Sequence, residues 1–253
     1  MSLIFDWFDK IKRYAFLKPG ETRAVIIAVI VIGFIISFDK WGPDKEIDFV
    51  VGFTNLLVSI VLVAVIFYLR LLFQKIVSLG ADLQAEFKLW SLGLMLGLVV
   101  VFITNGKLWF LIPGGIVIHY MPGHRVGWVR YGLNYFGVGI VGLAGPIANI
   151  LLAMIFIILF KIFSVEIFYT AFILNLVWAI WTILPIPPAD GSRIFFGSRM
   201  VYMFGLAIVV SSAILLYSDI PIIITIPASF LIASLWWLIY YVVWERFNWK
   251  GPY

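Results

Sequence analysis

The feature that most constrains this chain is a series of long apolar runs that contain few or no charged residues. Several of these runs reach the roughly 20 residues that a helix needs to cross a hydrocarbon core of about 30 Å. Apolar residue types make up 64% of the 253 residues and charged types only 12%, which excludes an ordinary water-soluble domain. The sequence therefore predicts an all-α polytopic membrane protein.

Hydropathy predicts six full membrane spans. Their approximate ranges are 24–38, 49–73, 135–160, 167–184, 200–217 and 221–244. Residues 3–18 place Trp7, Phe8 and Ile11 on one helical face, with Lys10 and Lys12 off it, which predicts an amphipathic helix lying on the membrane surface. We expect Pro19 to end this helix, residues 1–22 to form the interfacial segment, and residues 23–253 to form one transmembrane domain. The alternative is that the apolar face contacts a protein partner.

Two shorter apolar pieces, about 91–104 and 108–118, form either one crossing or a hairpin that enters the membrane and returns. With a hairpin, 14 of the 18 Lys and Arg residues lie on the cytoplasmic side, whereas a single crossing divides them equally. Because Lys and Arg concentrate in cytoplasmic loops, the charges favour a re-entrant or short helical hairpin. Both termini are then cytoplasmic, and the protein is expected in the cell membrane. Residues 85–90, just before the hairpin, are predicted to be extended.

Charge and composition also limit the partners and cofactors. The net charge of +5 is explained by basic residues at cytoplasmic membrane edges, so the lipid bilayer, and not a nucleic acid, is the expected partner. The chain has no cysteine, which excludes disulfides, a thiol nucleophile and a cysteine metal site. No pattern predicts a bound cofactor.

One acidic residue stands at a helix break. The stretch 184–193 reads Leu-Pro-Ile-Pro-Pro-Ala-Asp-Gly-Ser-Arg and closes a long apolar segment. Proline lacks a donor N–H and glycine accepts unusual backbone angles, so the helix ends before Asp190. An acid at such a break in a membrane protein indicates a functional site, with a simple helix cap as the alternative.

The motif Gly145-Pro146-Ile147-Ala148-Asn149 precedes this stretch by about 35 residues. Together the two motifs resemble the core of the site-2 protease family of intramembrane metallopeptidases. The resemblance covers roughly residues 49–200, and it extends to residues 85–90 and 113–115. It implies a site-2-protease-like fold.

The resemblance also implies a zinc ion held by two histidines of an H-E-x-x-H motif and by the Asp of the later motif, with the Glu as general base. In this chain the corresponding window is 68–72, where Tyr68, Leu69 and Leu72 stand in place of the catalytic residues. Thr182 replaces the family's Asn before Leu-Pro. Asp190 alone remains of the metal-binding set, so we expect no metal. The residues expected to keep a structural role or to line a partner groove are Gly145, Pro146, Asn149, Thr182, Pro185, Pro187, Pro188, Asp190 and Gly191.

Without zinc, an ionised Asp190 near hydrocarbon needs a partner, because an isolated charge there costs about 2.5–3.5 kcal/mol. The predicted partners are Lys75 or Arg193, helped by the Tyr68 hydroxyl, whereas Arg70 is predicted to point the opposite way. His119 and His124 are five residues apart across a turn and are expected to be loop histidines, although with Asp190 they could form an unusual site.

The leading interpretation is therefore a pseudoprotease: a non-catalytic, site-2-protease-like integral membrane protein that binds or scaffolds another membrane protein or transmembrane helix. One alternative is an active intramembrane zinc metalloprotease with atypical ligands. Another is a structural subunit of a larger membrane complex. A transporter is less consistent with the sequence, which has no inverted repeat.

Overall fold

A computed structural model describes residues 3–42, 48–121 and 135–246. The elements in chain order are α1 (Leu3–Tyr14), α2 (Pro19–Ser37), α3 (Phe49–Gly80), β1 (Leu83–Leu89), α4 (Ser91–Ile103), β2 (Gly114–Tyr120), α5 (Tyr135–Phe163), α6 (Glu166–Ile183), α7 (Asp190–Gly197), α8 (Arg199–Tyr217), α9 (Ile222–Tyr240) and the π-helical turn η3 (Tyr241–Glu245).

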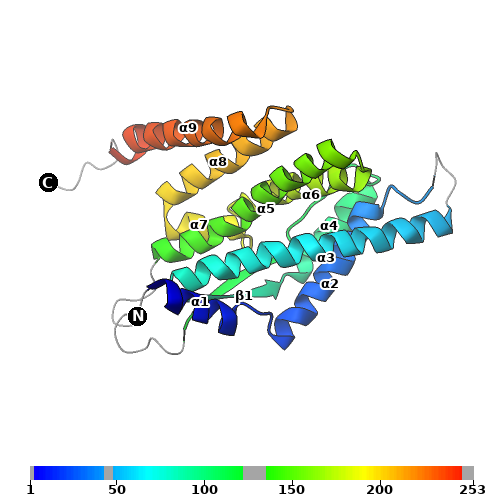
Figure 1. Cartoon of the computed structure of the whole chain (residues 1–253), viewed down its shortest axis with the longest axis horizontal. Coiled ribbons are helices and arrows are strands. Elements are labelled where there is room, and N and C mark those ends of the chain that lie inside the picture. Colours follow the sequence, from blue (N-terminus) through cyan, green and yellow to red (C-terminus); the bar gives the residue numbers. More distant parts are fainter. Residues whose placement is uncertain (1–2, 43–47, 122–134, 247–253) are drawn as a thin grey trace.

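In the described part of the chain, six helices are long and apolar enough to cross a membrane, namely α2, α3, α5, α6, α8 and α9 together with η3. Figure 1 shows α3, α5, α8 and α9 following one another across the molecule, with α9 at its outer edge. The prediction of an all-α polytopic membrane protein with six spans is confirmed. The spans differ from the predicted ranges mainly at their ends, where polar residues such as Glu21 extend the helices.

The two short apolar pieces form a hairpin. Helix α4 leads away from β1, and residues 108–113 return beside it as extended chain, so that β2 pairs antiparallel with β1 from Leu83↔Tyr120 to Leu89↔Gly114. Gly93 and Gly97 let α4 approach the returning chain, because a Cβ at Gly97 would lie 2.9 Å from the carbonyl oxygen of Phe110. The hairpin and the extended segment at 85–90 are both as predicted.

The core lies where α2, α3, α5 and α6 pack together. Its largest fully buried side chains include Trp178, Phe67 and Phe172. The Phe67 ring is 5.0 Å from the rings of both Phe87 and Trp178, which ties the sheet and α6 to α3. This packing fixes the rotation of α3 and hence decides which of its polar residues reach the site.

Helix α1 packs against the end of α3. The Trp7 indole donates a hydrogen bond to the carbonyl oxygen of Ile76 at 3.2 Å, and Ile11 packs with Leu72 and Leu79. Part of the predicted membrane-facing surface therefore contacts the chain's own core. Pro19, predicted to end this helix, begins α2 instead, because proline is well suited to the first turn of a helix.

Candidate functional site

The C-terminal half of the apolar helix α3 carries four buried polar residues: Ser78, whose hydroxyl donates to the Lys75 carbonyl oxygen of the same helix, and three with longer side chains. Arg70, Gln74 and Lys75 are 3%, 1% and 5% exposed. Successive residues of a helix are rotated by about 100°, so residues four apart share a face and neighbours do not. Arg70 and Gln74 accordingly face Asp190, whereas Lys75 faces α2. The two directions define two separate polar clusters.

The first cluster is built on an ion pair between Arg70 and Asp190. The Arg70 Nη2 donates a hydrogen bond to Asp190 Oδ2, and both side chains are almost completely buried. The Arg70 guanidinium also lies over the Trp178 ring, with its carbon 5.3 Å from the ring centroid. A guanidinium stacked on an aromatic face gains a cation–π attraction in addition to its ion pair. The Arg70 position is therefore fixed from two sides.

Further groups surround the carboxylate. Burial raises the pKa of Asp190, and the charge of Arg70 opposes this effect. The Gln74 amide, the Arg193 guanidinium and the backbone N–H of Ile116 also favour the ionised form. Four elements thus meet at Asp190, namely α3, α5, α7 and β2. Helix α7 carries both Asp190 and Arg193, and α5 approaches through Gly145.

Gly145 provides the space for this cluster. A Cβ at this position would lie 2.5 Å from Asp190 Oδ2, 2.7 Å from Gln74 Nε2 and 2.9 Å from Arg70 Nη2. Contacts below 3.0 Å would force the ends of these three side chains to shift, so glycine lets α5 approach the cluster this closely. One turn later on α5 stands Asn149, which is fully buried, and neither of its amide atoms has a hydrogen-bond partner in the described part of the chain.

The proline-rich segment brings Asp190 to the cluster. Helix α6 ends at Ile183, the Pro187–Pro188 bond is cis, and α7 starts at Asp190 itself. Gly191 lies against the carbonyl groups of Ile183 and Leu184, so a side chain there would block the turn. Pro185 and Pro187 are exposed.

Thr182 and Pro146, two of the residues expected to have a structural or groove-lining role, lie within helices beside the cluster. The Thr182 hydroxyl is buried and donates to the Trp178 carbonyl oxygen of its own helix at 2.8 Å. Pro146 lies inside α5, on the turn between Gly145 and Asn149. Both residues therefore shape the helices beside the cluster in the described structure.

The second cluster closes the edge of the sheet. Lys75 Nζ donates to Glu21 Oε2 at 2.7 Å and to the carbonyl oxygen of Phe16 at 3.2 Å. The other carboxylate oxygen of Glu21 accepts the backbone N–H of Phe87 at 2.9 Å. Glu21 therefore satisfies a donor on the outer edge of β1 that an added strand would need.

Several predicted contacts of Asp190 are corrected by this geometry. Lys75 pairs with Glu21 and not with Asp190. Tyr68 is 41% exposed and does not hydrogen-bond to Asp190 among the described groups. Arg193 lies close enough for its charge to act on the carboxylate, but among described side chains only Arg70 forms an ion pair with it.

The correction has a simple geometric cause. A shift of two residues along α3, from the window 68–72 to 70–74, rotates the side chains about the helix axis by about 200°. Leu69 is 40% exposed, and Leu72 packs towards α1. The pair with four-residue spacing that faces Asp190 is Arg70 and Gln74. The sequence contains a signal for this face. Arg70 and Gln74 are polar residues inside an apolar span, and such residues indicate a functional site.

These residues do not fit a zinc ion. Zinc needs three protein ligands with available lone pairs and an open position for water. The guanidinium of Arg70 stays protonated and has no lone pair to offer a metal. It also forms an ion pair with Asp190, the carboxylate that would be the remaining ligand. Gln74 contributes a neutral amide, which donates from Nε2 to the Val141 carbonyl oxygen at 3.3 Å.

His119, the histidine within the described residues, lies at the surface and apart from this cluster. His119 on β2 is opposite Gln84, and its Nε2 is 3.8 Å from Glu86 at the surface. His124 lies outside the described residues. Among residues 3–42, 48–121 and 135–246 there is no group of three or more His, Asp or Glu side chains that could hold a metal.

Comparison with known proteins gives a distant relative. A protein of Methanocaldococcus jannaschii named "Putative zinc metalloprotease" is 29% identical over 181 residues, which cover 69% of this chain and 82% of that protein. No protein-family model matches the chain, and no solved structure matches it. The likeness is consistent with the resemblance to site-2 proteases.

Proposed function

We propose that this protein is a non-catalytic, site-2-protease-like membrane protein that binds another membrane protein. In this proposal it resides in the cell membrane with both termini cytoplasmic. The observation that supports it best is the buried pair of Arg70 and Asp190. An arginine stands on the helix face where a metallopeptidase of this kind needs a neutral metal ligand.

The chemistry of hydrolysis explains the importance of this exchange. A zinc-bound water becomes a nucleophile near neutral pH only because the ion lowers its pKa to about 7. Arg70 supplies a positive charge to Asp190 but no coordination position for water. A general base is also needed near the water, and the residue after Arg70 on α3 is Leu71. The cluster therefore favours a structural role for Asp190.

Binding is the proposed activity because the scaffold is retained without hydrolytic groups. The turn at Gly191, the close approach at Gly145 and the ion pair hold α3, α5 and α7 together as one unit. The identity of the bound protein is to be found by isolating the native protein from its own membranes and analysing the associated chains by mass spectrometry.

The test of the non-catalytic proposal compares the purified protein with its Asp190→Ala variant. We expect less than stoichiometric zinc in both, and no cleavage of membrane-embedded peptides by either. The distant relative is named a putative zinc metalloprotease, so the alternative outcome is an active metalloprotease. Stoichiometric zinc, or peptide cleavage, that disappears in Asp190→Ala would establish that second function and overturn the proposal.

A further inference from the structure

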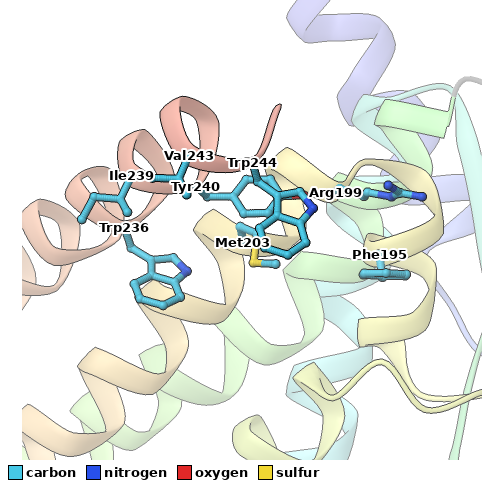
Figure 2. Close-up of a pocket in the computed structure, with 8 residues that line it drawn as sticks. All are labelled: Phe195, Arg199, Met203, Trp236, Ile239, Tyr240, Val243 and Trp244. Atoms are coloured by element: carbon cyan, nitrogen blue, oxygen red, sulfur yellow. The ribbon is translucent and has the colours of Figure 1, made fainter. Parts of the chain in front are cut away.

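An open apolar cavity lies between α8 and α9 at the end where α8 begins. Its volume is about 470 Å³, which lies within the range of small-molecule sites. Figure 2 shows Arg199 at one end of this cavity and Trp236 at the other, with Met203, Tyr240 and Trp244 between them. Among the described lining residues, Arg199 is the only charged one.

A second cavity of about 430 Å³ continues along the same helices, and Trp236 borders both. Some of the α8 residues that line the two cavities recur at intervals of three or four. One such series is Arg199, Met203, Leu206, Val210 and Ile214. This spacing forms one stripe about 22 Å long at 1.5 Å per residue. One leaflet of the hydrocarbon core is about 15 Å thick, so the stripe is long enough to cross a leaflet.

The charge at the end of this stripe is available to a ligand. Arg199 is exposed and forms no ion pair with any described carboxylate. Tyr240 and Trp244 lie beside it, and such residues are typical of the membrane–water boundary. A basic residue between membrane helices at this depth attracts anionic lipid headgroups.

We propose that the groove formed by these two cavities binds one anionic phospholipid. Its phosphate contacts the Arg199 guanidinium, and one hydrocarbon chain lies along the stripe past Trp236. The exposed apolar surface of α9 makes a lipid the appropriate ligand, because α9 packs chiefly on α8 and its membrane window is only 17% buried. This inference is independent of whether Asp190 has a catalytic role.

The test is native mass spectrometry of the full-length protein after exposure to an equimolar mixture of phosphatidylglycerol and phosphatidylcholine with identical chains. We expect phosphatidylglycerol to be retained about fivefold more than phosphatidylcholine, the effect of one basic residue near a headgroup. Arg199→Gln should abolish this preference. The matched control is Arg246→Gln, because Arg246 is an exposed arginine that lines neither cavity.

A second variant tests the hydrocarbon part of the site. Met203→Trp fills the groove without changing a charge, so retention of both lipids should fall severalfold while thermal stability stays near that of the parent protein. The proposal is wrong if both lipids are retained equally by the parent protein. It is also wrong if Arg246→Gln has the same effect as Arg199→Gln, or if Met203→Trp releases a bound protein chain and leaves lipid retention unchanged.

Discussion

Arg70 and Asp190, 120 residues apart in the sequence, form an ion pair in which the two side chains are only 4% and 3% exposed. Neither charge can be solvated by bulk water in this position. The pair therefore joins α3 and α7 only as long as both members are present, and its removal can be tested one residue at a time.

Replacing Arg70 with methionine should destabilise the protein by about 3–5 kcal/mol, because it leaves a buried carboxylate without its ion-pair partner. The double variant Arg70→Met/Asp190→Leu should lose less than Arg70→Met alone, since it removes both charges. Thermal unfolding in detergent, followed by tryptophan fluorescence, measures both effects. Arg13→Met is the control, because Arg13 pairs with Asp9 at the exposed surface and should contribute less than about 1 kcal/mol. Additive losses in the double variant would show that the two charges do not stabilise each other.

Gly145→Ala should destabilise the protein by about 1–3 kcal/mol, since the new methyl group is forced against three polar groups of the cluster. Gly20→Ala on α2 is the matched control, because a Cβ there has no neighbour within 4 Å. The control should be neutral or stabilising by up to about 1 kcal/mol, as expected for alanine in a helix. Equal effects of the two substitutions on the unfolding temperature would contradict the described packing around Asp190.

Glu21→Gln should weaken the contact between α2 and the sheet. The substitution leaves Lys75 as a buried cation without a counter-charge, which we expect to cost several kcal/mol. The Phe87 amide, which donates to Glu21, should also exchange its hydrogen faster with solvent. Hydrogen-exchange mass spectrometry of the β1 region measures this change. Glu86→Gln is the control, because Glu86 is more exposed and pairs with Lys18 at 3.3 Å. Unchanged hydrogen exchange at Phe87 in the Glu21→Gln variant would refute the role of the Glu21 carboxylate.

Hydropathy and charge bias predicted the spans and the hairpin because lipid imposes length and apolarity on every crossing, independently of tertiary contacts. The break before Asp190 was likewise predictable from its prolines and Gly191. The partner of Asp190 depends on the rotation of α3, for which the polar residues Arg70 and Gln74 in an apolar span were the available sequence signal. Packing of Phe67 against Phe87 and Trp178 sets that rotation, and such contacts have no local sequence signal.

The rotation of α3 leads to a prediction about metal binding. Introducing Arg70→His, Leu71→Glu and Gln74→His together places an H-E-x-x-H motif on the helix face that meets Asp190. Histidines four residues apart can reach one ion, so with Asp190 the triple variant has three zinc ligands. We expect about one zinc per chain, measured by elemental analysis after dialysis, and loss of this zinc when Asp190→Ala is added.

The matched control carries the same three residue types at the window first predicted, as Tyr68→His, Leu69→Glu and Leu72→His. Tyr68 and Leu69 are 41% and 40% exposed, and Leu72 packs towards α1, so this motif should gain no zinc that depends on Asp190. The two variants carry the same motif on different faces of α3, and in the control Arg70 keeps its ion pair with Asp190. If the control binds zinc through Asp190 and the variant at residues 70–74 does not, then α3 is rotated by half a turn from the arrangement described, and Arg70 is not the partner of Asp190.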